Sequence, residues 1–303
     1  MYDIITFGSA TWDVFLKPKN YQELKNKRFI KGKGICFSLG SKVDVEDIYL
    51  FSGGGGTNAA ATFVKQGFKT AYFGTIGNDL AGKEIIRELR KLGIDVCFVS
   101  KTNLKPTNYS VIFNTGLKRN RTVLTYRGAS EFLRERNIPW NKLKKAKWFY
   151  LAPLSGKAAR LTEKIISFAK KNKIKLALNP GNSQLCLKNI NKIIKKVDIL
   201  ILNQEEASLI GGFNKIDKIC PGIIIMGSKG VRVSNGKRIY KAKPLKIKVI
   251  DRTGAGDALG SGFVSGYIKS KGDIEYALKL GSDNSSSCVQ QWGAKQGLLK
   301  KKL

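Results

Sequence analysis

The residues with the clearest chemical content form the segment Asp251-Arg252-Thr253-Gly254-Ala255-Gly256-Asp257, which leads into a helix-like run of small residues. The backbone N–H groups of Gly254, Ala255 and Gly256 can point outward together at a helix start, where the helix dipole adds positive potential. This arrangement predicts an anion hole for the charge that develops on a transferring phosphoryl group. Asp257 lies in the first turn beside it, and its carboxylate could accept the proton of an incoming hydroxyl group.

A structural interpretation of the same segment is a glycine-rich turn whose aspartate only caps the helix. That interpretation would be favoured for a bare Gly-x-Gly, because so short a pattern is common. A seven-residue segment with an acid at each end is far more specific. We therefore favour the catalytic interpretation, with Asp257 as a general base.

A second glycine-rich segment, Gly53-Gly54-Gly55-Gly56-Thr57-Asn58, lies about two hundred residues earlier and opens an apolar helix. Glycines allow a backbone to approach a bound molecule closely. A flexible loop is the structural alternative, but the asparagine at the helix start favours a binding role. We expect this segment to contact the substrate.

Histidine is absent from the chain, and this limits the chemistry. The five cysteines, none of them paired at metal-ligand spacing, are Cys36, Cys97, Cys186, Cys220 and Cys288. A zinc site or a His-based dyad therefore has almost no ligands to draw on, and serine hydrolases and cysteine proteases of the usual kinds are excluded. A general base must be Asp, Glu, Lys, Tyr or Cys. We interpret the cysteines as buried free thiols of a protein in a reducing cytosol.

The elements that must position these segments alternate along the chain. Strands are predicted at residues 3–8, 70–75, 148–151, 175–178, 198–202 and 223–226, and two helices close the chain at about 256–270 and 273–288. Strands alternating with helices predict a mostly parallel sheet covered on both faces. Ligands bind such sheets at the carboxyl ends of the strands, so both glycine-rich segments should meet there.

Two further segments, about 14–50 and 100–127, contain short strands that do not fit this alternation. No repeat or long linker divides the chain. We expect one domain over residues 1–303, with these segments inserted as a small β-rich appendage.

The two glycine-rich segments resemble the two signatures of the PfkB, or ribokinase-like, family of carbohydrate and nucleoside kinases. Other elements in the family's order extend the resemblance over nearly the whole chain: Gly8-Ser9, Gly74-x-x-Gly77-Asn78-Asp79, Asn179-Pro180, Asn203-x-x-Glu206 and Gly227-x-x-Gly230. The resemblance implies a three-layer α/β/α sandwich with a mostly parallel central sheet and a small β-sheet lid. In several members the lid also pairs two subunits, which implies a homodimer.

The resemblance further implies roles for single residues. Asp257 matches the family's catalytic base, and Gly254, Ala255 and Gly256 match its anion hole. Substrate-binding positions are matched by Asp13, Gly53, Gly54 and Asn58, and nucleotide-binding positions by Asn203, Gly227, Gly230 and Asn284.

Two metal sites are implied in the same way. Asn203 and Glu206 match the element that organises Mg²⁺ and the phosphates, usually through water, and such oxygen ligands suit this ion. Asp251 and Thr253 match a loop that binds a monovalent cation, such as K⁺, in many members.

We therefore predict ATP-dependent phosphotransfer to a hydroxyl group of a sugar, as in ribokinase or fructokinase. A nucleoside kinase of the same family is the alternative, because a nucleoside pocket needs an apolar or aromatic slot for the base. That slot could be built by Trp12, Phe37, Tyr109 and Phe113. The sequence leaves the choice between sugar and nucleoside open.

The charge of the chain raises a different possibility. With 55 basic and 22 acidic residues, the net charge is +33, which is typical of nucleic-acid binding. However, most of the basic residues are lysines spread along the chain, whereas proteins that read bases favour arginine. We interpret the charge as a solvated surface, and a non-catalytic nucleic-acid-associated protein remains a remote alternative.

Hydropathy indicates a soluble protein without membrane partners. Apolar residues make up 42% of the chain, but no apolar run approaches the roughly 18 to 20 residues that span a bilayer. The N-terminus lacks the basic-then-apolar layout of a signal peptide. We expect a cytoplasmic protein.

Overall fold

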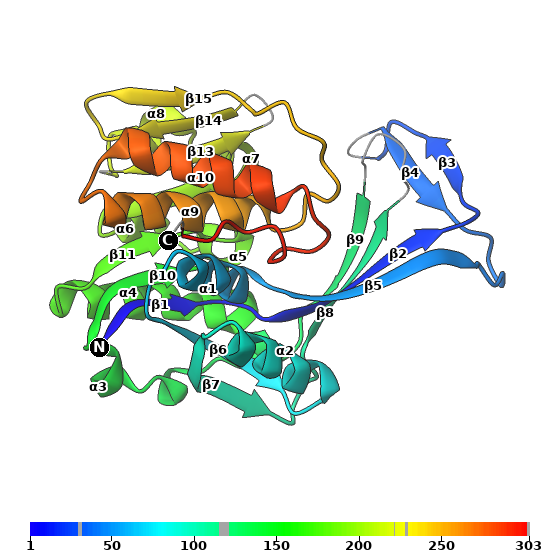
Figure 1. Ribbon diagram of the computed structural model, residues 1–303, viewed down its shortest axis with the longest axis horizontal. Coiled ribbons are helices and arrows are strands. Elements are labelled where there is room, and N and C mark those ends of the chain that lie inside the picture. The colour runs from blue at the N-terminus through cyan, green and yellow to red at the C-terminus, as the bar shows by residue number, and fades with distance from the viewer. Residues whose placement is uncertain (30–31, 115–120, 221, 228–229, 302–303) are drawn as a thin grey trace.

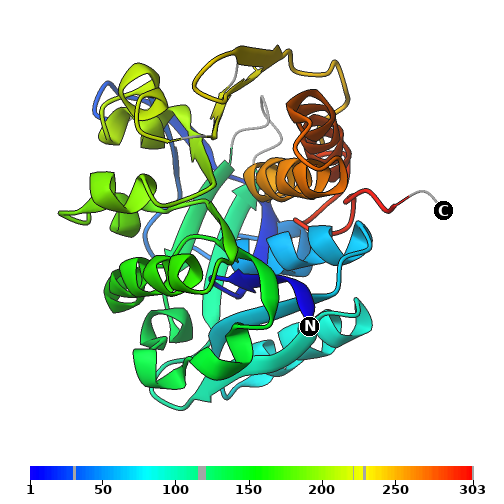
Figure 2. The same cartoon turned by 90° about the vertical axis from the view of Figure 1, so that its left-hand side faces the viewer.

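The computed structural model describes residues 1–29, 32–114, 121–220, 222–227 and 230–301. Its main body is a large sheet with helices on both faces, and a smaller sheet projects from one side of this body (Figure 1). Figure 2, in which the left-hand side of Figure 1 faces the viewer, shows the helices of the C-terminal part and those of the middle part of the chain separated by the sheet. The predicted α/β/α sandwich and β-sheet lid are confirmed.

The main sheet is formed by the buried apolar strands that the sequence predicts. In spatial order it contains β15 (Ile239–Ala242), β14 (Gly230–Ser234), β13 (Ile223–Gly227), β12 (Ile199–Asn203), β11 (Lys175–Leu178), β10 (Ala146–Leu151), β1 (Tyr2–Phe7), β6 (Thr70–Gly77) and β7 (Asp95–Thr102). In this spatial order, each strand from β13 to β7 is parallel to its neighbours in the run. The β14–β15 hairpin adds an antiparallel edge beside β13. Every residue of β6 is buried, as expected where helices cover both faces.

The helices form two layers, each packed on its own apolar core. One layer contains α1 (Gly55–Lys65), α2 (Leu80–Lys91), α9 (Ala255–Lys269) and α10 (Ile274–Cys288). The other contains α3 (Trp140–Leu143), α4 (Leu161–Lys171), α5 (Asn182–Leu185), α6 (Ile190–Ile194), α7 (Gln204–Leu209) and α8 (Phe213–Asp217), with 3₁₀ turns at Ala129–Phe132, Glu135–Asn137 and Gly156–Arg160. None of the helices in these described ranges is long and apolar enough to cross a bilayer.

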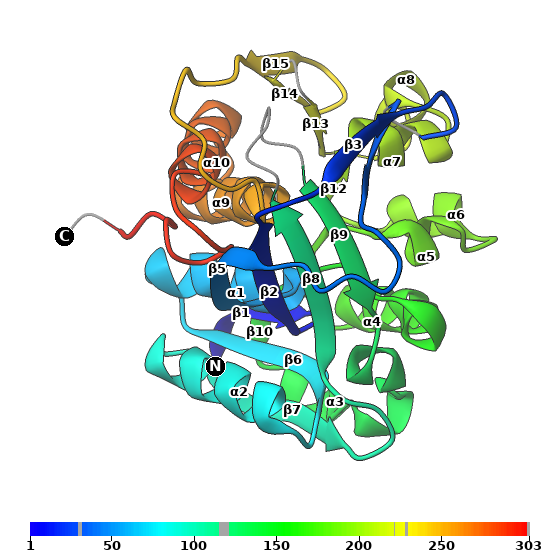
Figure 3. The ribbon, with the colours of Figure 1, turned by 90° about the vertical axis from the view of Figure 1, so that its right-hand side faces the viewer.

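The lid is a four-stranded sheet in the order β5 (Val45–Gly53), β2 (Thr11–Pro18), β8 (Asn108–Asn114) and β9 (Arg121–Tyr126), seen face-on in Figure 3. A small hairpin of β3 (Gln22–Lys25) and β4 (Lys33–Cys36) lies beyond its tip. Residues 100–102, which we expected in the lid, belong to β7 of the main sheet. Short connections join the lid to the body, because three residues separate β1 from β2 and a single residue separates β5 from α1.

Alternation along the lid strands gives the lid two different faces. Asp13 of β2 is aligned with Ser110 of β8, and Arg121 of β9 is on the same side of the sheet; we call this side the inner face. Val14, one residue further, is aligned with Leu50 and Val111 on the other side, which we call the outer face. The inner face is the one that meets the glycine-rich segments.

The cysteines differ from our expectation. All five are free, but only Cys220 and Cys288 are buried, whereas Cys97 and Cys186 are exposed and Cys36 is partly exposed. Cys97 lies on β7, the edge strand of the main sheet. The burial of an individual thiol could not be inferred from residue type alone.

Candidate active site

The two glycine-rich segments meet where α1 and α9 begin. Asn58 of α1 and Asp257 of α9 are 199 positions apart in the sequence, yet Asn58 Nδ2 donates a hydrogen bond to Asp257 Oδ2 at 2.8 Å. Asn58 is 4% exposed, and its Oδ1 has no hydrogen-bond partner among the described residues. The asparagine therefore orients the carboxylate and retains an unused acceptor beside it.

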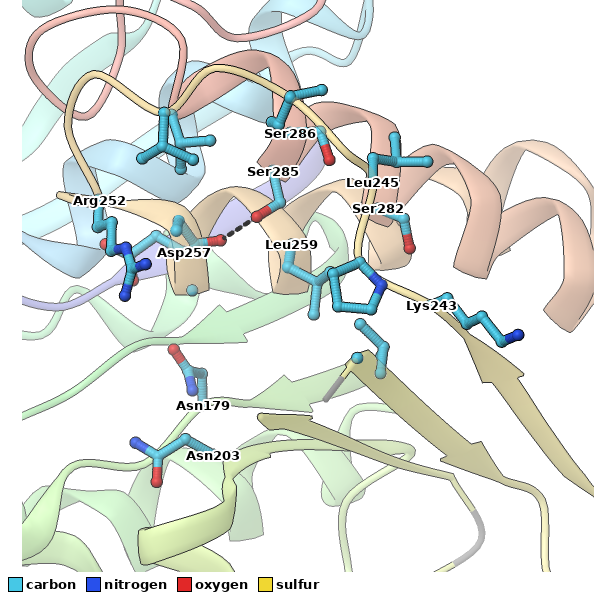
Figure 4. A pocket seen from close by; sticks show the side chains of 18 of the residues that line it. Asn179, Asn203, Lys243, Leu245, Arg252, Asp257, Leu259, Ser282, Ser285 and Ser286 are labelled. Carbon is cyan, nitrogen blue, oxygen red and sulfur yellow. Dashed lines mark hydrogen bonds between the residues drawn. The ribbon is translucent and has the colours of Figure 1, made fainter. Parts of the chain in front are cut away.

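Gly254 gives the predicted anion hole its shape. It is the N-cap of α9 and has a left-handed backbone with φ of 76°, where a side chain would be strained and its Cβ would overlap Ala294. The first N–H groups of the helix have no acceptors within it. The Ala255 N–H contacts Arg252 O at 3.3 Å, and Ser285 Oγ donates to Ala255 O at 3.0 Å (Figure 4). A side chain of α10 therefore holds the turn at the start of α9 in place.

The acid–base properties of Asp257 follow from its surroundings. Burial raises the pKa of its carboxyl group, while the hydrogen bond from Asn58 and the charge of Lys295 act in the opposite direction. Asp257 still lines a cavity, so one side of the carboxylate remains accessible to a ligand. A raised pKa makes this group a better proton acceptor than an ordinary aspartate.

Replacing Asn58 tests this balance. We expect Asn58→Leu to raise the pKa of Asp257 further, because the ionised carboxylate loses its hydrogen-bond donor. A base acts only when ionised, so activity will then be lost at a higher pH as the solution is acidified. The measurement is the pH profile of kcat/KM beside that of Asn214→Leu, a substitution at an exposed position on α8. An acid limb that stays in place or moves to lower pH would contradict the assignment.

A cavity of about 620 Å³ extends from Asp257 between the ends of the central strands and helices α9 and α10. Figure 4 shows Asn179 and Asn203 on one side of it and Asp257 and Arg252 on the other. The far end is formed by apolar side chains of the segment after β15, namely Leu245, Ile247 and Val249. Its volume is typical of small-molecule sites, and its polar and apolar ends suit a nucleotide.

Asn203 and Glu206 form a reciprocal capping box at the start of α7. Glu206 N donates to Asn203 Oδ1 at 2.7 Å, and Asn203 N donates to Glu206 Oε2 at 2.8 Å. Both residues also line the cavity. Burial raises the pKa of Glu206, and the nearby charge of Asp257 adds to the rise. Two acids facing one cavity, with amide oxygens beside them, fit a bound Mg²⁺.

Asp13 lies on the lid side of the site, on β2. It is 5% exposed, and burial raises its pKa to about 6, against the effects of a hydrogen bond with Ser110 and the charge of Lys295. Gly53 lies against it so closely that a Cβ there would overlap the carboxylate. Gly54 is the N-cap of α1, with φ of 97°. The structure therefore brings Asp13, Gly53, Gly54 and Asn58 together.

Lys295 is a residue of the site that the sequence interpretation missed. It is 2% exposed, and its Nζ donates to Ser52 O at 3.1 Å and to Ser52 Oγ. Burial lowers the pKa of this amine, and the charges of Asp13 and Asp257 oppose that change. Nothing in the sequence distinguishes this lysine from the many others. Arg252, which also lines the cavity, could have been found, because it lies inside the signature segment.

The start of β14 contributes to the cavity wall. Gly227 is paired with Gly230 across the hairpin, and Gly230 lines the cavity. The position of Asn284 does not match a nucleotide contact. Its side chain is fully buried, with Nδ2 donating to Ala258 O at 2.8 Å and Oδ1 accepting from Leu299 N at 2.9 Å. Asn284 joins α10 to α9 and to the C-terminal segment.

The aromatic slot that we considered for a base is not formed beside Asp13. Three of its residues are on the outer face of the lid: Trp12, Tyr109 and Phe113. Each is an odd number of residues away from Asp13 or Ser110, the inner-face residues of the same strands. Phe37 contacts Phe113, with ring centroids 5.7 Å apart. Because successive side chains of a strand point to opposite faces of the sheet, these rings lie on the other side of the lid from the Asp13 carboxylate.

Comparison with known proteins agrees with this geometry. A family model described as pfkB family carbohydrate kinase matches residues 30–301. An uncharacterized sugar kinase of Archaeoglobus fulgidus is 27% identical, over 77% of this chain and 96% of that protein. The ribokinase of Haemophilus influenzae is 26% identical, over 86% of this chain and 88% of that protein. The solved structure of a Methanocaldococcus jannaschii nucleoside kinase has the same fold, with a TM-score of 0.79 at 20% identity, over 98% of this chain and 95% of that one.

Proposed function

Because the chain belongs to the pfkB family of carbohydrate kinases, we propose that it transfers the γ-phosphoryl group of ATP to a hydroxyl group of a sugar, with Asp257 as the general base. Membership of this family indicates that the chain is a phosphotransferase that acts on a hydroxyl group. The observation that carries the assignment of the base is the hydrogen bond that fixes Asp257 at the first turn of α9, between the cavity and the substrate side.

The proposed reaction uses these groups in one displacement. The substrate oxygen attacks the γ-phosphorus, its proton passes to Asp257, and the bond from phosphorus to the bridging oxygen breaks to release ADP. N–H groups of the turn at Gly254–Gly256 face the negative charge of the transferring group. Glu206 and Asn203 would hold Mg²⁺, mostly through water, and the bound ion would neutralise phosphate charge. The apolar end of the cavity would receive the base of ATP.

A sugar is favoured over a nucleoside by the polarity around Asp13. Ser110 shares a hydrogen bond with Asp13, and the positive charges of Lys295 and Arg121 act on the same carboxyl group. Several donors and acceptors around one carboxylate suit a ligand that carries hydroxyl groups on most of its carbons. This is the basis on which we propose a sugar.

One observation keeps a nucleoside as the second candidate. Tyr49 of the inner face is stacked on Trp292, with ring centroids 5.0 Å apart and an angle of 18° between the rings. Both rings are partly exposed. A purine or pyrimidine could extend this stack from the region of Asp13.

The decisive experiment is a coupled assay of ADP release with Mg-ATP and a panel of pentoses, hexoses, sugar phosphates and nucleosides. Strong turnover of one class, abolished by Asp257→Asn, would support the proposal and choose between the two candidates. Turnover confined to nucleosides would replace the first candidate by the second. A folded protein that binds no ATP and phosphorylates nothing would contradict both.

We further propose that the lid pairs two copies of the chain through its outer face. Four apolar side chains there are between 40% and 58% exposed: Ile48, Leu50, Leu124 and Tyr126. They lie on the same face of β5 and β9, the two edge strands of the lid, and Val14 of β2 and Val111 of β8 continue the apolar surface between them. Such a surface is typical of an interface.

Leu124→Lys should weaken this association, because each copy would bring a charge to the apolar interface. We expect the molar mass from light scattering to fall from that of a dimer to that of a monomer at micromolar concentration. Leu209→Lys, on α7 and equally exposed, is the matched control and should leave the mass unchanged. A parent protein that is monomeric at all concentrations would contradict the proposed pairing.

A further inference from the structure

Arg121, the first residue of lid strand β9, contacts the loop that leads into the anion hole. Its Nη1 donates to Asp251 Oδ1 at 3.0 Å and also to Thr253 Oγ1. The Asp251 side chain is 3% exposed and the Arg121 side chain is 33% exposed. A charged hydrogen bond, buried at its acidic end, therefore joins the lid to this loop.

The Asp251 carboxylate is surrounded by donors. Its Oδ1 also accepts from Thr253 N at 2.9 Å and from Thr253 Oγ1 at 2.8 Å, and its Oδ2 accepts from Gly293 N at 3.2 Å. A cation held by Asp251 and Thr253 would need the lone pairs of these oxygens, which here face N–H and O–H groups. These two residues do not fit the monovalent cation site that the family resemblance implies.

The positive charge that such an ion would bring is already supplied by Arg121. A buried carboxylate is costly unless a charge or several donors compensate it, and Asp251 has both. Arginine is well suited to this position, because its guanidinium stays charged at any ordinary pH and can donate to two acceptors at once. Arg121 also lies within electrostatic reach of Asp13, on the same face of the lid.

We propose that Arg121 is a positioning residue that replaces the monovalent cation at the anion-hole loop, so that the kinase works without potassium. The proposal rests on the proposed phosphotransfer at Gly254–Asp257. Thr253 immediately precedes Gly254, so a contact that fixes Thr253 also fixes the turn that carries the N–H groups of the hole.

The location of Arg121 on the lid gives this replacement a second effect. A free ion would neutralise Asp251 whether the lid is near the loop or away from it. Arg121 delivers its charge only when β9 lies over the loop, as it does in this structure. The anion hole is therefore fully supported only with the lid in place, which links its geometry to lid closure.

The test compares the parent protein with Arg121→Gln and Arg121→Lys in buffers of equal ionic strength that contain either potassium or choline chloride. We expect the turnover of the parent to differ by less than about twofold between the buffers, and that of Arg121→Gln to fall about tenfold in choline, in line with a misplaced reacting geometry. Potassium should restore most of the activity of Arg121→Gln, because the ion can then neutralise Asp251. Arg121→Lys, which keeps the charge, should not respond to potassium.

A second readout needs no turnover. Without substrates, potassium should raise the Tm of Arg121→Gln relative to choline by about 2 °C, and should leave the parent unchanged. Arg127→Gln, also an exposed arginine of the lid, is the matched control and should show no response specific to potassium.

Strong activation of the parent by potassium would overturn the proposal, as would an Arg121→Gln protein that matches the parent in both buffers and both readouts. The Tm comparison decides the matter even where no acceptor is phosphorylated. The absence of phosphorylation of any acceptor would count against the proposed function alone. Failure of the proposed function and failure of the proposal for Arg121 can therefore be told apart. Should Arg121→Gln not fold, a potassium-independent parent beside a potassium-independent Arg121→Lys would support the proposal, and a potassium-dependent parent would overturn it.

Discussion

Asp257→Asn should reduce kcat by about 10²- to 10⁴-fold, the usual contribution of a positioned general base. The amide has nearly the shape of the carboxylate, so the start of α9 should keep its structure while losing the proton acceptor. Binding of a non-hydrolysable ATP analogue, measured by calorimetry, should change little, which would place the loss in the chemical step.

The matched control for this substitution is Asp283→Asn on α10. Asp283 is paired with Lys279 at the surface, 2.8 Å away, and takes no part in the cavity. Its turnover should equal that of the parent. If Asp257→Asn kept turnover within about tenfold of the parent, a general-base role would be untenable.

Asp13→Ala should reduce kcat/KM by about 10²-fold, chiefly through a higher KM for the phosphate acceptor. A carboxylate that binds two hydroxyl groups makes charge-assisted hydrogen bonds worth about 1.5 to 3 kcal/mol each. The KM for ATP should be nearly unchanged, because Asp13 lies on the lid side of the site, away from the residues that line the cavity. Steady-state kinetics with each substrate varied in turn separates the two effects.

Asp47→Ala is the control for Asp13→Ala, since Asp47 is on the same inner face of the lid, but further from the body and exposed. It should leave both KM values unchanged. An Asp13→Ala protein whose KM for ATP rises as much as its KM for the acceptor would show that Asp13 has been assigned to the wrong substrate.

The main sheet and the pair of signature segments could be predicted from the sequence because both depend on local patterns. Apolar strands between amphipathic helices determine the parallel sheet, and the end of β12 places Asn203 and Glu206 at its carboxyl edge. The meeting of the two glycine-rich segments follows from the same logic, since each opens a helix at that edge, whereas the hydrogen bond between Asn58 and Asp257 is a finding of the structure. These features need no knowledge of which strands are neighbours in the lid.

The features that were missed depend on contacts between distant segments. Lys295 reaches Ser52 across 243 positions, and Arg121 reaches Asp251 across 130. A lysine or arginine in a strongly basic chain carries no local signal that it is buried or paired. The misassigned aromatic slot has a related cause, because strand register decides which lid face each ring occupies. Asn284 could be separated from a nucleotide contact only once α9 and α10 were packed together.

The short connections between lid and body carry a consequence for selectivity. Because three residues join β1 to β2 and one joins β5 to α1, the lid cannot swing without moving Asp13 and Gly53, which lie at its root. In the proposed function, the acceptor would therefore bind at the hinge of the lid that encloses it. A sugar of the wrong shape would leave these hinge residues out of position and the lid open. Selection among acceptors would therefore act through lid closure. Water would then be excluded from bound ATP only when an acceptor of the right shape allows the lid to close.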